Sequence, residues 1–110
     1  MTQSESLLNV SVTFRHTEST PALKAYATEK IINCLQKYIS HPSDIHVILS
    51  VEKRDHTAEA VVRSKIYDVS GKASTGDLYS AIDKMCDTLV AQLRKQKGRH
   101  LDSKHQAAEV

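Results

Sequence analysis

The sequence predicts a single α+β domain in which a four-stranded sheet carries both of its helices on one face. The chain has 110 residues, the usual size of one domain. Apolar residues make up 40% of it and charged residues 25%, a composition that allows a packed core with a solvated surface. Apolar residues recur with the period of a strand in four segments and of a helix in two, in the order β-α-β-β-β-α.

The first strand and the first helix are predicted between Leu8 and Ile39. Leu8, Val10, Val12 and Phe14 alternate with polar residues, as in a half-buried strand. Thr20 can cap a helix that begins at Pro21. The apolar stripe of this helix recurs at steps of three and four residues: Leu23, Ala27, Ile31, Cys34, Leu35 and Tyr38. We expect the helix to run to about Ile39 and the segment 40–43, which contains Pro42, to turn the chain back.

Three further strands follow without an intervening helix. Ile45, Val47, Leu49 and Val51 alternate again, and Ile48 on the other face indicates a central strand. After a polar turn at 52–56, the next strand carries Ala60, Val62 and Ser64 on one face and Glu59, Val61, Arg63 and Lys65 on the other. The fourth strand has small inward residues at Val69, Gly71, Ala73 and Thr75, and we interpret Gly71 as a packing residue that lets a helix approach.

The last helix is predicted from Asp77, which can serve as its cap. Its apolar stripe consists of Leu78, Ile82, Met85, Leu89 and Leu93. We expect this helix to extend to about Lys97 and to stop at Gly98. The chain would then divide into a domain at residues 1–98 and a flexible basic tail at 99–110.

The order of these elements also predicts their topology. A right-handed crossover makes the first two strands parallel neighbours, while short turns make the last three an antiparallel meander. Both helices bury one stripe most economically side by side on the same face of the sheet. The final three strands and helix resemble the corresponding part of double-stranded RNA-binding domains.

Several classes of protein are disfavoured by composition. No segment approaches the roughly 18 consecutive apolar residues of a membrane span, and residues 1–8 are polar, so we expect a cytoplasmic protein with no membrane partner. Cys34 and Cys86 are too few and too far apart for a disulfide framework or a zinc site, and we interpret both as reduced apolar residues.

Catalysis and metal binding also find little support in the sequence. An acylphosphatase-like enzyme would need a phosphate-cradling loop after the first strand, but residues 15–18 contain no glycine. The pairs His41 with His46 and His100 with His105 lack the helical i, i+4 spacing of metal ligands. We therefore expect no catalytic activity, no metal and no cofactor.

Positive charge is concentrated near the C-terminus, although the net charge is only +2. Between Thr88 and His105 a single acid, Asp102, faces five cations: Arg94, Lys95, Lys97, Arg99 and Lys104. Such a run is either an ordinary solvated helix end or a polyanion-binding surface. The five aromatic residues fall mostly in apolar patterns, so a platform for stacking several unpaired bases is not expected.

One segment resembles a known family. Residues 77–83, Asp-Leu-Tyr-Ser-Ala-Ile-Asp, are followed by Met85, Asp87, Leu89, Gln92-Leu93 and Lys95-Gln96-Lys97. This pattern is similar to the second helix of short ribosome hibernation-promoting factors and ribosome-associated translation inhibitors. The resemblance continues in residues 20–23, 45–53 and 56–60, and it covers roughly Leu8 to Lys97.

The resemblance implies a protein that binds the small ribosomal subunit at the sites of messenger and transfer RNA and inhibits translation. In this family basic side chains contact ribosomal RNA, and the matching positions here are Lys24, Lys30, Arg63, Lys65, Arg94, Lys95 and Lys97. Recognition would be of RNA shape and backbone. Lys24 and Lys30 also fit plain solvated helix positions. For Asp77, Tyr79 and Asp83 we favour structural roles in packing and helix-dipole compensation.

The resemblance leaves the outcome of binding open. Short members help inactive ribosomes pair, together with a second protein factor, whereas members with a longer tail prevent pairing. The tail after Gly98 is not strongly acidic, which favours the pairing class over the longer-tailed inhibitors. A generic RNA-binding module is the coarser alternative. We expect the free protein to be a monomer, because no apolar stripe is left over once both helices cover the sheet.

Overall fold

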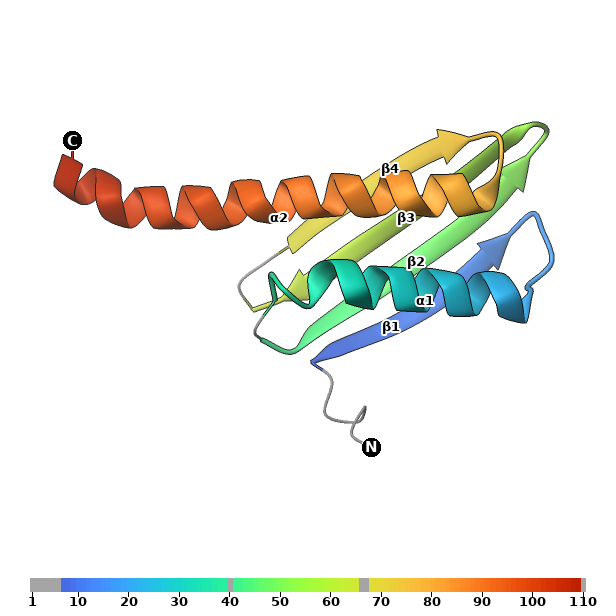
Figure 1. The fold of residues 1–110 in the computed structure, drawn as a ribbon, viewed down its shortest axis with the longest axis horizontal. Coiled ribbons are helices and arrows are strands. Elements are labelled where there is room, and N and C mark those ends of the chain that lie inside the picture. Colours follow the sequence, from blue (N-terminus) through green and yellow to red (C-terminus); the bar gives the residue numbers. More distant parts are fainter. Residues whose placement is uncertain (1–6, 40, 66–67, 110) are drawn as a thin grey trace.

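The elements follow the predicted order along the chain. The computed structural model describes residues 7–39, 41–65 and 68–109, and side chains as far as residue 96. Its elements are β1 (Leu8–Arg15), α1 (Pro21–Leu35), β2 (Ser43–Glu52), β3 (Asp55–Ser64), β4 (Asp68–Thr75) and α2 (Leu78–Glu109) (Figure 1).

The four strands form one mixed sheet in the order β1-β2-β3-β4. β1 runs parallel to β2, with Val10 beside Ile45. β2 pairs antiparallel with β3, and β3 antiparallel with β4, so that Ala60 lies between Val47 and Gly71. The predicted crossover and the predicted meander are both confirmed.

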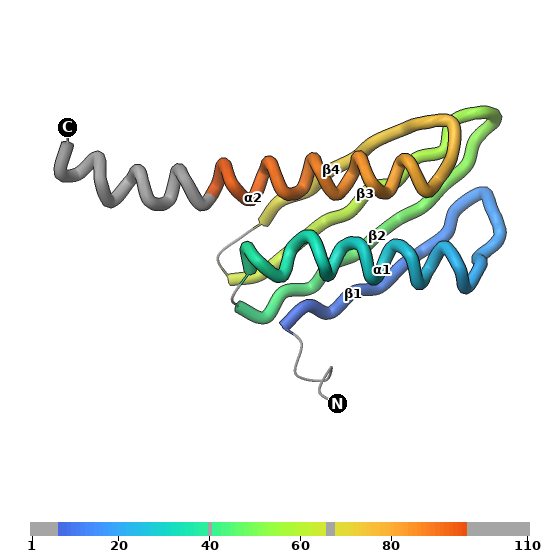
Figure 2. The backbone as a smooth tube through the Cα atoms, in the orientation of Figure 1, coloured from blue at the N-terminus to red at the C-terminus, as the bar shows by residue number. Residues whose placement is uncertain are grey.

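Both helices lie on the same face of this sheet and run in the same direction, α1 over the β1 side and α2 over the β4 side (Figures 1 and 2). The core between the layers includes Ala27, Ile31 and Leu35 of α1 and the whole predicted stripe of α2. From the sheet it receives the inward residues Ile45, Val47, Leu49, Ala58, Ala60, Val62 and Val69. Burial of this apolar surface is what holds the helices on the sheet.

At Gly71 of β4 the backbone of α2 lies close against the sheet, whereas a side chain at Gly76 would meet nothing within 4 Å. A Cβ atom built at Gly71 would lie 3.1 Å from the Met85 carbonyl oxygen and 3.2 Å from Leu89 Cγ. The absence of a side chain therefore lets the helix backbone settle onto β4, as interpreted from the sequence.

Both predicted helix caps are present. The Thr20 hydroxyl accepts a hydrogen bond from the Leu23 backbone N–H at 3.2 Å, and Asp77 Oδ1 accepts one from the Ser80 N–H at 2.8 Å. Each cap satisfies a backbone donor that has no partner inside the first helical turn.

The predicted end of the first helix was wrong by four residues, since α1 ends at Leu35 rather than Ile39. The N–H groups of Tyr38 and Ile39 both bond to the Leu35 carbonyl oxygen, which tightens the chain into a turn. Ile39 remains buried at 5% exposure. The early end lets the chain reverse in time for β2 to begin at Ser43, whose N–H bonds to the Leu7 carbonyl oxygen.

The predicted stop at Gly98 was also wrong, because α2 continues to Glu109. A glycine within a helix costs about 1 kcal/mol relative to alanine, but it does not by itself end the helix. Its neighbours Lys97 and Arg99 are good helix formers. The division into a domain at 1–98 and a flexible tail at 99–110 stays a prediction.

Candidate nucleic-acid interface

The predicted RNA-binding residues lie on different faces of the sandwich rather than in one patch. Lys24 and Lys30 are on α1 and the exposed side chains of Arg94 and Lys95 are on α2, all in the helix layer. Arg63 is exposed on the opposite, uncovered face of the sheet, and Lys65 is exposed just beyond the end of β3. The side chain of Lys97 lies outside the described residues.

The uncovered face of the sheet carries closely matched charges. Lys72 lies opposite Glu59 in the register, and Arg63 lies opposite Asp44 on one side and Asp68 on the other. Opposite charges at such positions attract each other across the strands. The acids on this face therefore offset the positive charge of its cations, and the face is less attractive to a polyanion than the number of cations suggests.

One end of the sandwich does gather unbalanced positive charge. The end of α1, the end of β3, the start of β4 and the point where α2 leaves the sheet all lie there (Figures 1 and 2). Exposed cations on these segments are Lys37, Arg63, Lys65, Arg94 and Lys95, which we call the basic end. Among the described side chains at the neighbouring strand ends, Asp44 and Asp68 are the only acidic residues, so five positive charges face two negative ones.

Lys37 was missed in the sequence because it stands alone, without a neighbouring cation, near the end of a helix. The only signal that could have found it was topological. Parallel helices over a β1-β2-β3-β4 sheet bring the end of α1 to the same side as the end of β3. A crossover fold thus joins charges that are far apart in the chain.

The solvated-helix-end interpretation of Arg94 and Lys95 does not fit α2. Cations complement the helix dipole only within the last turn of a helix. α2 ends at Glu109, and its last turn holds no basic residue. Dipole compensation therefore does not account for these two side chains.

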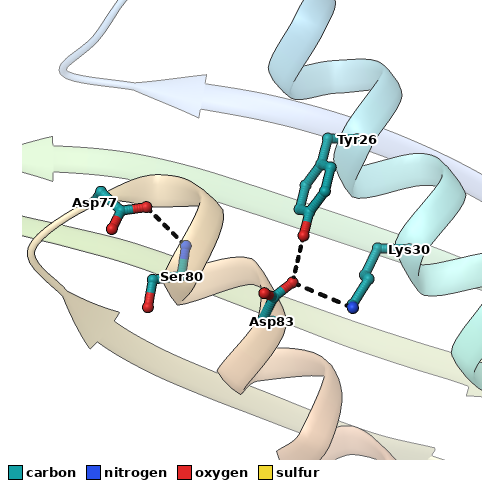
Figure 3. A network of polar contacts seen from close by, with 5 residues as sticks. All are labelled: Tyr26, Lys30, Asp77, Ser80 and Asp83. Carbon is teal, nitrogen blue, oxygen red and sulfur yellow. Dashed lines mark hydrogen bonds and ion pairs between the residues drawn. The ribbon is translucent and has the colours of Figure 1, made fainter.

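Lys30 has a specific partner in the seam between the helices. Its Nζ atom lies 3.4 Å from Asp83 Oδ1, and the same oxygen accepts a 2.7 Å hydrogen bond from the Tyr26 hydroxyl (Figure 3). The negative charge of Asp83 raises the pKa of Lys30, and the hydrogen bond to Asp83 raises the pKa of Tyr26. Lys30 is thus an ion-paired residue rather than a plain solvated one.

Tyr79 extends this cluster at the first turn of α2. Its ring packs against that of Tyr26 with centroids 4.9 Å apart and planes at 68°, an edge-to-face arrangement. The side chain is nevertheless 44% exposed. The predicted packing role therefore accounts for only part of the surface of Tyr79. Asp77 has the structural role of a helix cap.

Lys24 lies away from both groups. It is exposed one turn into α1, beside a shallow hollow that is also lined by Pro21, Ala25 and Ile32. This is the side of α1 that faces away from α2, since Tyr26 and Lys30 face α2. The other described residues that line this hollow include the acid Glu29 and no second cation, which does not favour an anion there.

The described part of the chain contains two cysteines and several potential metal ligands. No three His, Cys, Asp or Glu side chains within it are grouped to hold a metal ion. Cys34 and Cys86 are free thiols, and burial raises the pKa of Cys86 far above its usual value, which disfavours the reactive thiolate. No helix of the described residues is long and apolar enough to cross a membrane.

Comparison with known proteins identifies the family. The sequence profile described as "Sigma 54 modulation protein / S30EA ribosomal protein" matches residues 10–101, which includes parts of all six elements. The chain belongs to this S30EA family. The resemblance stated from the sequence is thereby confirmed.

Relatives of this S30EA protein carry a consistent name. It is 32% identical over 92 residues to the ribosome hibernation promoting factor of Escherichia coli, covering 84% of this chain and 96% of that protein. The factor of the same name from Pseudomonas putida is 31% identical, with 82% and 87% of the two chains covered.

Solved structures support the same fold for this S30EA chain. The N-terminal domain of Protein Y from Thermus thermophilus superposes with a TM-score of 0.72 at 27% identity, covering 79% of this chain and 97% of that one. A ribosomal subunit interface protein from Coxiella burnetii also gives 0.72, at 24% identity over 82% and 98% of the chains. The latter bears on the fold alone.

Proposed function

We propose that this S30EA protein is a hibernation factor that binds the small ribosomal subunit at the messenger and transfer RNA sites and inhibits translation. The observation that carries the proposal is the basic end, where cations from several separate segments converge. The names of its relatives, ribosome hibernation promoting factors, support the same conclusion. The protein would act in the cytoplasm, where ribosomes are, and without catalysis.

The chemistry of the basic end fits the RNA backbone. Each ammonium or guanidinium group that meets a phosphate releases condensed counterions, and an arginine can hold a phosphate through two parallel N–H donors. The sandwich presents these groups on packed helices and strands or directly beside their ends, so RNA shape rather than base sequence would decide where it binds. Lys97, two positions after Lys95 in the sequence, is proposed to take part with Arg94 and Lys95.

The salt dependence of binding tests this assignment. Replacing Arg94, Lys95 and Lys97 together by alanine should weaken binding to purified small subunits. The slope of log affinity against log salt should become shallower by roughly 0.7 to 0.9 for each lost phosphate contact. The melting temperature should hold, because Arg94 and Lys95 are exposed and the apolar stripe is untouched.

A charge-matched control separates the basic end from net charge. Arg54, in the β2–β3 hairpin at the other end of the sandwich, and Lys72, on the uncovered sheet face, are both exposed. The pair Arg54→Ala with Lys72→Ala removes the same charge as Arg94→Ala with Lys95→Ala. Equal affinity losses for the two double variants would refute the basic end as the main RNA contact.

We also propose that the bound protein promotes pairing of inactive ribosomes, with one copy per small subunit and a second protein factor. The segment 99–110 is not strongly acidic, since Asp102 and Glu109 are balanced by Arg99 and Lys104, and this supports pairing over inhibition without pairing. Sedimentation of ribosomes with added protein would distinguish the two outcomes. Light scattering of the free protein should give a monomer, and a stable free dimer would contradict the proposed mode of action.

A further inference from the structure

Tyr79 is an exposed aromatic residue whose position is fixed from the neighbouring helix. Among the described residues only Leu7 and Tyr79 are large apolar side chains that are exposed, and Leu7 lies just before the first strand. Tyr79 instead lies in the first turn of α2 beside the seam with α1. Because Tyr79 is 44% exposed, much of its apolar surface is not buried and does not contribute to the stability of the core.

A chain of contacts holds this ring in place. Tyr79 packs edge-to-face on Tyr26, whose hydroxyl donates to Asp83, and Asp83 pairs in turn with Lys30 (Figure 3). Tyr26 and Lys30 come from α1, whereas Tyr79 and Asp83 come from α2. The orientation of the ring is therefore set by the packing of two helices. A surface held in this way loses little side-chain entropy when a ligand binds.

We propose that Tyr79 and Lys30 form a site for one unpaired nucleotide of ribosomal RNA. The base would stack on the exposed surface of Tyr79, and its phosphate would approach the ammonium of Lys30, whose side chain is 40% exposed. Base stacking on an exposed aromatic ring does not depend on which base is present, since every base has a π-face. This inference rests on the proposed function and names a second point of RNA contact within it.

The charges around the ring favour a nucleotide over an arginine side chain. An arginine stacked on Tyr79 would bring its guanidinium toward the Lys30 ammonium, and like charges repel. Asp83 could attract it, but Asp83 Oδ1 already receives both the Tyr26 hydroxyl and Lys30.

The site is separate from the basic end. Tyr79 and Arg94 lie fifteen residues apart in one helix, or about 22 Å along its axis. The RNA would therefore contact α2 at two points, through stacking near its start and through phosphate contacts where it leaves the sheet. The two kinds of contact respond differently to salt, which makes them separable.

Two substitutions at Tyr79 test the stacking. Tyr79→Ala should weaken small-subunit binding by roughly tenfold without changing the salt slope, because stacking releases no counterions. Tyr79→Phe keeps the ring and should bind like the parent. Binding of Tyr79→Ala equal to that of the parent, or binding of Tyr79→Phe as weak as that of Tyr79→Ala, would overturn the stacking role.

Titration of the parent protein with short ligands provides an independent readout. The Tyr79 ring resonances should shift upfield on addition of hexaadenylate, as expected for a ring under a stacked base, and arginine amide should leave them unchanged. A response to arginine amide but not to hexaadenylate would overturn the inference. If the parent fails to bind small subunits, the proposed function fails, and the hexaadenylate titration still decides the Tyr79 site.

Discussion

The Tyr26 hydroxyl donates a 2.7 Å hydrogen bond to Asp83, which lies 57 positions further along the chain and on the other helix. The same carboxylate pairs with Lys30, so one acidic side chain links α2 to two residues of α1 (Figure 3). The segment that carries the family resemblance thus contributes a polar link between the two helices. The contribution of this link to the stability of the fold depends on the protonation of Tyr26 and Lys30.

The first prediction concerns alkaline pH. Because the pKa values of Tyr26 and Lys30 are both raised, the folded state holds these protons more tightly than the unfolded state. The resulting stability is fully present below the ordinary values, about 10 for tyrosine and 10.4 for lysine, and is lost as pH rises through the folded-state values. Asp83→Asn should lower the Tyr26 pKa, measured as tyrosinate absorbance, whereas exposed Asp87→Asn should change it little. Identical titration curves for parent and Asp83→Asn would contradict this.

The second prediction concerns the close approach at Gly71. Gly71→Ala places a methyl group 3.1 Å from the Met85 carbonyl oxygen, and helix backbone packed on a sheet yields little. We expect a loss of about 1 to 3 kcal/mol in the free energy of unfolding, as for overpacked cores. Gly76→Ala is the matched control, because nothing lies within 4 Å of its Cβ position. Equal denaturation midpoints for the two variants would show that α2 shifts freely.

The third prediction concerns the register of α2. Ile82 is fully buried, so Ile82→Asp places a carboxylate without a partner in the seam between helix and sheet. This should cost several kcal/mol, enough to unfold a domain of ordinary stability. Gln92→Asp introduces the same side chain at an exposed position of the same helix and should cost about 1 kcal/mol or less. Comparable melting curves for the two variants would mean that the register is wrong.

The fourth prediction concerns the two thiols. Burial raises the pKa of Cys86, and its side chain is fully buried, so it should not react with a disulfide reagent while the protein is folded. Half-buried Cys34 should react alone in the native protein, and both thiols should react in denaturant. A Cys34→Ser variant should therefore show no rapidly reacting thiol, and one that still reacts would place Cys86 at the surface.

The fifth prediction concerns the C-terminal segment. Leu93 is the last buried residue among those whose side chains are described, and we predict that the core does not extend into the segment after Gly98. Removal of residues 99–110 should leave the free energy of unfolding nearly unchanged. It should also preserve small-subunit binding. A truncated protein that no longer binds small subunits would place an essential contact in the removed segment.

The sequence by itself determined the parts of this protein that depend on local periodicity. The alternation from Leu8 to Phe14, the stripe from Leu78 to Leu93 and the caps at Thr20 and Asp77 all appear as predicted. Each depends on residues within a few positions of one another, where spacing fixes which side chains share a face. The crossover rule then converted element order into topology, because the handedness of such connections is nearly invariant.

Only the tertiary structure decided which distant residues meet and where the helices end. The end of α1 at Leu35 follows from the reversal into β2, and no local signal marked it. Tyr26 meets Asp83, and Lys37 joins the end that carries Arg94, because parallel helices on one face of the sheet bring these positions together. Polar side chains such as Asp83 and Lys37 are not part of a periodic apolar pattern, so the sequence does not indicate which residues they meet. Their roles depend on distances across the fold, and the amino-acid sequence alone does not give these distances.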